Sequence, residues 1–245
     1  TPVALRIALR VGMLDQPGDH KSHDSPVPYL GGLAIVVAFS ASVAVAAVID
    51  APPNGMGELV TVLGLALILA ITGLVDDLKS LSPVLRFVPQ VACALVVWWA
   101  GEGVAITQVE AVDLGITILW LVGITNAFNL LDNMDGLSAG LAGITSLTFF
   151  AIAAANGQYL VAGLSIGLAG CSLGFLRHNF HPASIYMGDG GSMFLGFLVG
   201  YLGLKLRFDS PMSRSFIVPI LACTPAVFDT TVVVCSRLWY RRNPL

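Results

Sequence analysis

Charged residues are scarce in this chain of 245 residues. They make up 11% of it, whereas a soluble domain contains about 25%. Hydrophobic residues make up 56%, and the mean hydropathy is +0.84. These values exclude an ordinary soluble protein. The net charge of −3 is too small to indicate a nucleic-acid partner.

Paired cysteine motifs are also lacking. The four cysteines, Cys93, Cys171, Cys223 and Cys235, lie in apolar runs without a CxxC pair. This excludes a disulfide framework or a zinc ribbon and indicates small core residues. No signal-peptide pattern opens the chain, which begins at Thr1 and ends on the basic stretch RLWYRRNPL. We therefore expect residues 1–245 to be a single integral membrane domain, truncated at both ends.

The sequence contains several long apolar runs. A transmembrane helix needs about 20 mostly apolar residues. Eight runs approach this pattern: 29–49, 59–76, 84–100, 112–131, 137–155, 158–176, 191–206 and 215–236. The sequence therefore predicts an all-α fold, a polytopic transmembrane helical bundle with about eight spans.

The basic residues divide unequally between alternate loops. Nine of the twelve lie on one side, against Lys205, Arg207 and Arg214 on the other. Because cytoplasmic loops are enriched in Lys and Arg, the first side is predicted to be cytoplasmic. The acids of the opposite loops, such as Asp50, Glu58, Glu102, Glu110, Asp113 and Asp209, are expected to be solvated connections.

Acidic clusters end or begin several apolar runs on the predicted cytoplasmic side. They are Asp76–Asp77, Asp132 with Asp135, and Asp189. A carboxylate in or beside hydrocarbon is costly unless it is paired or bound to a metal. The clusters therefore predict one cation site facing the membrane surface, and a cation there suggests a phosphorylated substrate.

The first cluster lies in GLVDDLKSLS, predicted as a short loop after a helix. Adjacent carboxylates repel, so a bound cation or a cationic neighbour such as Lys79 would favour their ionised forms. A solvated acidic loop is the alternative.

The second cluster lies in NAFNLLDNMDGL. On a helix, Asn126, Asn129 and Asn133 would share a face, and Asp132 would lie three residues before Asp135. Amides can bind a nucleobase or sugar amide, and carboxylates can hold a metal or accept protons. A hydrogen-bond network that caps two helices is the alternative.

The third cluster is IYMGDGGS, before an apolar helix. Glycine lets the backbone approach a ligand, and a helix N-terminus favours anions. Asp189 could hold a divalent ion against phosphate oxygens, Tyr186 could stack on a base, and Ser192 could cap the helix. An ordinary glycine-rich turn is the alternative.

Three further polar positions are candidates. Lys21, flanked by His20 and His23, could bind phosphate or serve as a positive-inside anchor. Asp229 lies within an apolar run, where a carboxylate is a functional candidate or a helix–helix hydrogen-bond partner. Asn179, ten residues before Asp189, is a candidate of the same kind.

Together these segments resemble the polyprenyl-phosphate N-acetylhexosamine-1-phosphate transferases, which include the lipid I-forming translocase. The resemblance runs in order along the chain through DQPGDHKSHDSPVPYLGG, GLVDDLKSLS, NAFNLLDNMDGLSAG, FLRHNFHPASIYMGDGGSMFLGF and FDTTVVVCSRL. It implies a multi-pass enzyme of a bacterial plasma membrane with a cytoplasmic, Mg²⁺-dependent site, Mn²⁺ being the alternative. The reaction it implies passes a sugar-1-phosphate from a UDP-N-acetylhexosamine to polyprenyl phosphate and releases UMP, an early step of cell-envelope polysaccharide synthesis.

The resemblance also implies roles. Asp76 and Asp77 match the paired catalytic aspartates of the family, Asp77 and Asp189 match metal-binding positions, and Asp132 and Asp135 match catalytic positions. The implied substrate-binding residues are Lys21, Asn126, Asn129, Asn179, Tyr186 and Asp229. A homodimer is a further implication.

The form VPYLGG of the first loop is closer to the antigen and teichoic-acid branch, which favours UDP-N-acetylglucosamine as donor. UDP-MurNAc-pentapeptide is the alternative donor. An ion-coupled transporter and a catalytically inactive scaffold are alternatives from other classes. Three departures from the family stand out: it has about ten spans, a His-rich loop follows the basic stretch where this chain ends, and Asn133 replaces a commoner glycine.

Overall fold

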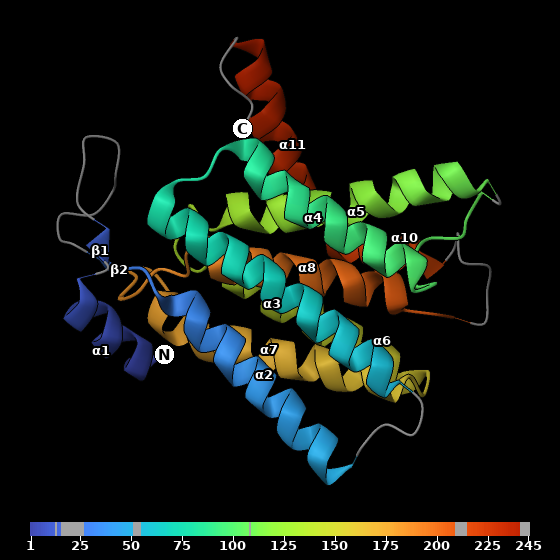
Figure 1. Cartoon of the computed structure of the whole chain (residues 1–245), viewed down its shortest axis with the longest axis horizontal. Helices are drawn as coiled ribbons and strands as arrows, with labels where there is room; N and C mark the ends of the chain where they lie inside the picture. Colours follow the sequence, from blue (N-terminus) through green and yellow to red (C-terminus); the bar gives the residue numbers. More distant parts are fainter. Residues whose placement is uncertain (13, 16–26, 51–54, 108, 209–214, 241–245) are drawn as a thin grey trace.

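The computed structural model describes residues 1–245 except 13, 16–26, 51–54, 108, 209–214 and 241–245. Within these residues the only strands are β1 (Leu14–Asp15) and β2 (Val27–Pro28), which pair antiparallel. All other elements are helices (Figure 1), so the predicted all-α class is confirmed. They are α1 (Pro2–Val11), α2 (Gly31–Ile49), α3 (Met56–Lys79), α4 (Pro83–Trp99), α5 (Glu110–Leu131), α6 (Leu137–Ala155), α7 (Tyr159–Asn179), α8 (Asp189–Lys205), α10 (Ile217–Ala222) and α11 (Thr224–Trp239).

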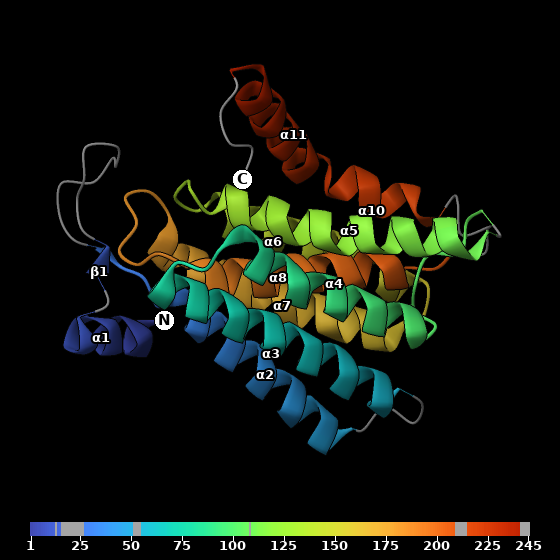
Figure 2. The same ribbon diagram turned by 45° about the horizontal axis from the view of Figure 1, so that its top comes forward.

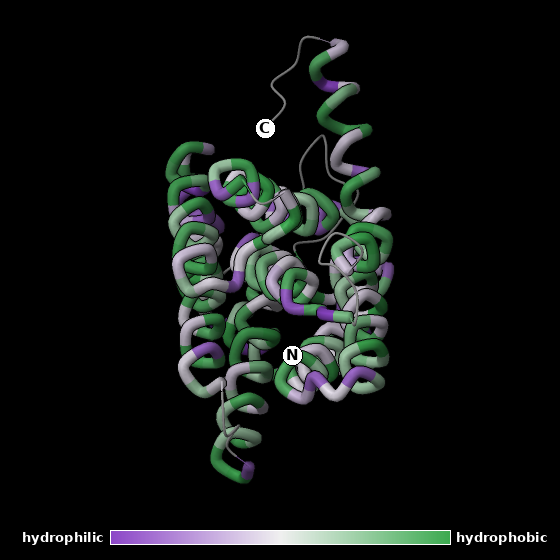
Figure 3. Tube along the Cα trace, turned by 90° about the vertical axis from the view of Figure 1, so that its right-hand side faces the viewer, coloured by the Kyte–Doolittle hydropathy of each residue, from purple (hydrophilic) through white to green (hydrophobic). Residues whose placement is uncertain are grey.

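Seven of the eight predicted runs coincide with one helix each. Five described helices, α2, α3, α5, α6 and α7, are long and apolar enough to cross a membrane. Helix α4 is apolar but shorter, and α8 has 17 residues. Hydrophobic residues dominate the helical stretches along the trace (Figure 3). The predicted polytopic helical membrane protein is confirmed.

Helix α8 forms the centre of the bundle (Figures 1 and 2). Every residue from Gly190 to Leu204 is buried, and α2, α3, α5, α6 and α7 all pack against the helix. Glycine allows this close packing: a Cβ at Gly196 would lie 2.8 Å from the Cα of Thr125 in α5. Small residues at such contacts are characteristic of helices that associate within membranes.

The prediction of one helix over residues 215–236 is wrong. The chain forms α10 and α11 there, and the two meet at Cys223. Pro225 lies in the first turn of α11, where its missing N–H is tolerated, but its ring prevents α10 from continuing. Helix α11 therefore leaves the bundle at an angle (Figures 1 and 2).

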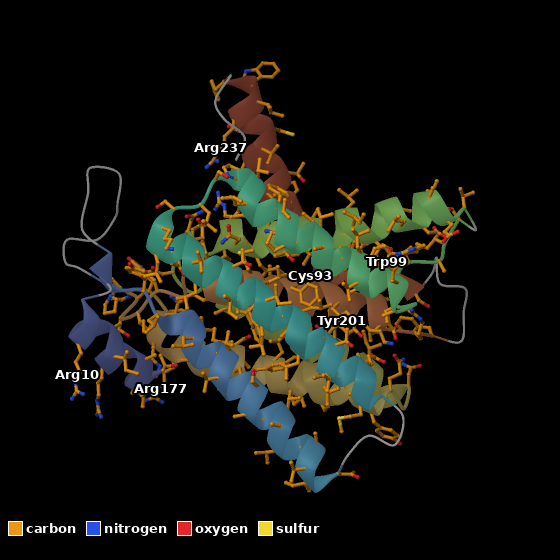
Figure 4. All side chains as sticks on the ribbon, viewed as in Figure 1. Arg10, Cys93, Trp99, Arg177, Tyr201 and Arg237 are labelled. Carbon is orange, nitrogen blue, oxygen red and sulfur yellow. The ribbon has the colours of Figure 1, made fainter. Side chains whose placement is uncertain are left out.

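The bundle has two ends that are used below. The site end is where α3 and α5 finish and α2 and α8 begin, and the far end is where α2 and α4 finish and α3 and α7 begin. Figure 4 labels Arg10 and Arg177 toward the site end, and Trp99 and Tyr201 toward the far end.

The expectation that the far-end acids are solvated connections is wrong for Glu58, Glu102 and Asp113. Lys205 forms ion pairs with Glu58, at 3.1 Å, and with Glu102. Asp113 is 4% exposed, and its Oδ1 accepts hydrogen bonds from the backbone N–H groups of Ile106 and Thr107. These carboxylates are retained inside because each is matched by a cation or by N–H donors.

Candidate active site

The site is built first on the junction between α3 and α8. The backbone N–H of Asp189 donates to Asp77 Oδ1 at 2.9 Å, and the N–H of Gly190 donates to Asp77 Oδ2 at 3.3 Å. The first N–H groups of a helix lack intrahelical acceptors, and a carboxylate satisfies them well. Asp77 therefore fixes the end of α3 against the start of α8.

Two glycines make this contact possible. A Cβ at Gly73 would lie 2.3 Å from the carbonyl oxygen of Asp189. Gly188 has φ 78°, and a Cβ there would lie 2.7 Å from Asp77 Oδ2. Any larger residue would therefore separate α3 from α8 or strain the turn before α8.

Asp189 is held by a third helix, α5. The amide Nδ2 of Asn129 donates to Asp189 Oδ1 at 2.8 Å and to Ser192 Oγ at 3.0 Å. The Ser192 hydroxyl in turn donates to the backbone carbonyl of Asp189 at 3.3 Å. The other carboxylate oxygen, Oδ2, lies 3.7 Å from Arg86 Nη1. The hydrogen bond from Asn129 orients the Asp189 carboxylate, and its Oδ2 faces Arg86.

Asp76 is the most deeply buried of the acidic residues at this end, with 6% exposure. Its Oδ1 accepts a hydrogen bond of 2.6 Å from the N–H of Leu81, and its Oδ2 lies 3.0 Å from Arg86 Nη1. Arg86, on α4, therefore bridges Asp76 and Asp189. Both Asp76 and Asp77 lie in the last turns of α3. Asp76 was the last residue of the predicted run 59–76, whereas the prediction that Asp77 lies in the loop after it is wrong.

Asp132 follows directly after α5 and faces the same group. Burial raises its pKa well above the ordinary value, and the carboxylates of Asp189, Asp77 and Asp135 raise it further. A hydrogen bond from the backbone of Gly188 opposes this shift. Burial is the larger cause, and the smaller contribution of the neighbouring carboxylates is the part that a bound cation would relieve.

Asp135 and Asn179 connect the turn after α5 to the loop before α8. Asp135 Oδ2 lies 2.9 Å from His181 Nδ1 and accepts the N–H of Ala183 at 3.1 Å. Asn179 is 2% exposed, and it accepts the N–H of Gly136 and donates to the carbonyl of Ile185. Its amide thus joins the two turns that carry Asp135 and Asp189.

The start of α2 lies beside the same loop. The N–H groups of Gly31 and Gly32 donate to the carbonyls of Tyr186 and Met187, and the N–H of Tyr186 donates to Pro28. A Cβ at Gly32 would lie 2.4 Å from Gly191. The segment VPYLGG therefore abuts the loop that precedes Asp189.

The structure brings together most, but not all, of the predicted site residues. One group contains Asp76, Asp77, Asn129, Asp132 and Asp189, and these residues together are called the carboxylate group below. Lys21, with His20 and His23, lies outside the described residues. The side chains of the other three predicted substrate-binding positions are placed differently, as described next.

Asn126 donates to Gln90 on α4 and to the carbonyl of Val122, so it lies in a contact between α4 and α5. Tyr186 is half-buried, with its backbone paired to Pro28 and Gly31. Asp229 is half-buried on α11 and, among the described residues, makes no hydrogen bond or ion pair with the carboxylate group. Their roles in substrate binding stay predictions.

The carboxylates suit a magnesium ion in a particular way. The described residues form no group of three or more His, Cys, Asp or Glu side chains that could hold a metal alone. Magnesium, however, is usually held by one or two carboxylates together with substrate phosphates and waters. Asp189 and the carboxylates beside it could supply the one or two oxygen ligands that such a magnesium ion needs from the protein.

Sequence reasoning missed the roles of Arg86 and His181. A bound cation or a cationic neighbour such as Lys79 was expected near the paired aspartates. Lys79 is exposed, and Arg86 on the next helix is the ion-pair partner of Asp76. Arg86 lies in the first turn of α4, so a basic residue just after the short connection from Asp77 was the available signal. His181 lies three residues after His178 and carried no distinct signal.

The chain matches the model of the family described as glycosyl transferase family 4 over residues 59–207. It is 36% identical to a Bacillus subtilis protein named a probable undecaprenyl-phosphate N-acetylglucosaminyl 1-phosphate transferase, over 97% of this chain and 68% of the relative. It is 34% identical to a decaprenyl-phosphate N-acetylglucosaminephosphotransferase of Mycolicibacterium smegmatis, over 98% of this chain and 67% of the relative.

A phospho-N-acetylmuramoyl-pentapeptide-transferase of Moorella thermoacetica is 34% identical over 97% of this chain and 80% of its own length. The family match covers more than half of the chain and includes every member of the carboxylate group, from Asp76 to Asp189. The resemblance read from the five sequence segments is therefore confirmed. The chain is a multi-pass membrane transferase and belongs to glycosyl transferase family 4.

Proposed function

We propose that this protein transfers N-acetylglucosamine 1-phosphate from UDP-N-acetylglucosamine to polyprenyl phosphate and releases UMP. The observation that carries the proposal is the meeting of Asp77, Asp132 and Asp189 at one end of an apolar bundle. A site at that end is reached from water by a nucleotide sugar and from the bilayer by a lipid phosphate. The names of the relatives support an undecaprenyl- or decaprenyl-phosphate acceptor.

The site end is proposed to face the cytoplasm. Arg6, Arg10, Arg86 and Arg177 lie at this end, whereas Lys205 and Arg207 lie at the far end. An excess of basic residues marks the cytoplasmic side of membrane proteins. This orientation gives the site access to nucleotide sugars made inside the cell.

The reaction must bring two anions together. An oxygen of the lipid phosphate attacks the β-phosphorus of the nucleotide sugar, the bond from that phosphorus to the bridging oxygen breaks, and UMP leaves with the electron pair. Positioning and charge neutralisation supply most of the acceleration in phosphoryl transfer. Magnesium bound near Asp189 would neutralise the diphosphate and the departing UMP.

The charged groups of the chain have distinct parts in this scheme. Asn129 and Ser192 hold the Asp189 carboxylate in one orientation, and Asp77 holds the backbone on which Asp189 is carried. Asp76 accepts N–H groups from Leu81 and Arg86, so it orients the Arg86 guanidinium. Arg86 can then donate to a phosphate oxygen that approaches Asp189.

A second donor is supported by one comparison. The Moorella relative is named for phospho-N-acetylmuramoyl-pentapeptide transfer and matches nearly the whole chain. UDP-MurNAc-pentapeptide is therefore the competing donor for the same site. The two donors share the UDP group and the acetamido sugar and differ in the lactyl peptide, so one assay with both distinguishes them.

The test is UMP release by the purified full-length protein in detergent. The assay contains undecaprenyl phosphate and Mg²⁺ with UDP-N-acetylglucosamine or UDP-MurNAc-pentapeptide in separate reactions. The expected result is UMP only with UDP-N-acetylglucosamine, dependent on the lipid and abolished by EDTA. Restoration by Mg²⁺ or by Mn²⁺ identifies the ion.

Release from UDP-MurNAc-pentapeptide alone would replace the proposed donor but keep the reaction class. Absence of UMP with either donor, from protein that unfolds cooperatively, would overturn the proposed reaction. Flux of a counter-ion in liposomes without nucleotide sugar would then favour the transporter interpretation.

A further inference from the structure

A cavity of about 750 Å³ opens at the far end of the bundle, away from the carboxylate group. Its apolar wall comes from α2, α3 and α7, including Val43, Ala46, Leu59, Leu160 and Leu164. Its polar end is formed by Asp50, Glu58, Gln158, Lys205 and Arg207. The cavity thus has an apolar part along the helices and a charged part at the helix ends.

Only some of the charged residues at the polar end of the cavity are already paired with other residues of the chain. Lys205 forms ion pairs with Glu58 and Glu102, and Tyr201 donates to Glu58 at 2.9 Å. Arg207 and Asp50, by contrast, make no ion pair with any residue that the structure describes. Within the part of the chain that the structure describes, one cation and one anion therefore remain for a ligand.

Arg207 is held at the edge of the cavity. Its backbone N–H donates to Gln158 Oε1 at 3.1 Å, and Gln158 Nε2 donates back to its carbonyl. One guanidinium nitrogen, Nη1, donates to the carbonyls of Leu204 and Leu206. Because a guanidinium has five N–H donors, several are left for an oxyanion.

The height of the cavity relative to the bilayer follows from aromatic residues. Trp99 ends α4 and is 76% exposed, and Tyr159 begins α7 and is 84% exposed. Such rings gather at the membrane–water interface, at the level of lipid headgroups. Tyr159 also lines the cavity. The charged end of the cavity therefore lies at headgroup level, and its apolar wall lies at the level of the acyl chains.

We propose that this cavity binds one zwitterionic aminophospholipid from the leaflet opposite the active site. The lipid phosphate binds Arg207, the ammonium group binds Asp50, and one acyl chain fills the space between α2 and α7. The lining has two acids and two bases, so its formal charge matches a zwitterion better than an anionic lipid. The proposal is independent of the proposed reaction.

Glycines of α7 provide a matched pair of test variants. Gly163 lines the cavity, and a Cβ built on it meets nothing within 4 Å, so the side chain of Gly163→Leu has open space at its base and is expected to extend into the cavity. Gly170 lies on the same helix, is equally open and does not line this cavity, so Gly170→Leu is the control. Both substitutions replace glycine within a helix and are expected to fold.

The measurement is native mass spectrometry of the full-length protein released from nanodiscs. The nanodiscs contain equal amounts of phosphatidylethanolamine and phosphatidylglycerol. We expect one retained phosphatidylethanolamine per chain in the wild type and in Gly170→Leu, and its loss in Gly163→Leu. Arg207→Gln should weaken retention about tenfold, as loss of a charged hydrogen bond does. Asp50→Asn should reduce the preference for phosphatidylethanolamine over phosphatidylglycerol.

Arg237→Gln, which removes a cation from α11, controls for net charge and should leave retention unchanged. Equal retention in Gly163→Leu and Gly170→Leu would overturn the site. Preferential retention of phosphatidylglycerol, unaffected by Asp50→Asn, would overturn the choice of an aminophospholipid. If Gly163→Leu does not unfold cooperatively, Arg207→Gln decides: retention equal to the wild type would also overturn the site.

Discussion

The two ends of the α3–α8 pair solve the problem of buried charge differently. At the far end, Lys205 lies between Glu58 and Glu102, and Tyr201 donates to Glu58, so the carboxylates have protein partners. At the site end, Asp76, Asp77, Asp132 and Asp189 lie near one another, and Arg86 is their only ion-pairing cation among the described residues. One cation thus serves two carboxylates at the far end, which we call the matched cluster, and one cation serves four carboxylates at the site end, which we call the unmatched cluster.

The difference separates stability from function. A matched cluster fixes two helices and gains little from any ligand. An unmatched cluster is expected to be destabilising by itself, because carboxylates held close together repel one another. That repulsion adds to burial in raising the pKa of Asp132, and a bound cation would reduce it. Proteins retain such local instability where a ligand uses it. The contrast predicts that substitutions at the two ends have opposite consequences for activity and stability.

The largest effect is expected from removing charge at the site end. Asp77→Asn, Asp189→Asn and Asp76→Asn should each lower UMP release by about a hundredfold to a thousandfold, because loss of one preorganised group at a transition state costs that much. Asp189→Asn should leave the thermal unfolding midpoint unchanged or raised in metal-free buffer, since carboxylate repulsion falls. Asp76→Asn should lower the midpoint, because it breaks the pair with Arg86.

Turnover near the wild-type rate in all three variants would contradict the assignment of the site. A lowered unfolding midpoint for Asp189→Asn in metal-free buffer would contradict the argument from repulsion. Differential scanning fluorimetry with and without Mg²⁺ provides the second readout.

The second effect concerns how closely α3 approaches α8. Gly73→Ala places a Cβ 2.3 Å from the Asp189 carbonyl, so the helices must separate and move Asp77 from the Asp189 N–H. We expect a loss of about 1–3 kcal/mol of stability and at least about tenfold of activity. Gly64→Ala, on the same helix with nothing within 4 Å of its Cβ, should preserve both. Equal behaviour of the two variants would argue against a role for this contact.

The sequence was sufficient for the helices and for the main carboxylates. The lengths of apolar runs are set by the thickness of the bilayer, so seven of the predicted runs coincide with one helix each. A carboxylate at the end of an apolar run is costly enough to be conspicuous. The sequence pattern did not reveal where a single residue ends one helix and begins another, as Pro225 does between α10 and α11.

Ion pairs and hydrogen bonds between residues on different helices could not be predicted from the sequence either. Lys205 joins Glu102 across more than a hundred residues, which spacing cannot reveal, whereas Arg86 joins Asp76 across a short connection and left only the weak signal of a nearby basic residue. Glu58, Glu102 and Asp113 were interpreted as solvated for the same reason. Asn129 was found because it shares a helix with residues near Asp132, but its contact with Asp189 depends on how α5 packs on α8.

A smaller effect on activity is expected at the far end. Lys205→Met leaves Glu58 and Glu102 close together with their cation removed, at 20% and 22% exposure. Breaking a buried pair in this way should cost about 2–3 kcal/mol of stability, whereas UMP release per folded molecule should change less than about twofold. Glu102→Gln keeps the Lys205–Glu58 pair and should cost less. A large loss of turnover in folded Lys205→Met would show that the two ends are not separable.

The smallest effect is expected at the edge of the site. His181 pairs with Asp135, but it is 80% exposed, and exposed pairs contribute about 0–1 kcal/mol. The N–H of Ala183 would still hold Asp135 in His181→Gln. We therefore expect a change of less than about fivefold in the KM for the nucleotide sugar and no change in kcat, whereas Asp135→Asn should have the larger effect. A tenfold fall in kcat for His181→Gln, with Asp135→Asn unaffected, would mean that the histidine itself contacts the reacting phosphates and that the unmatched cluster extends to this loop.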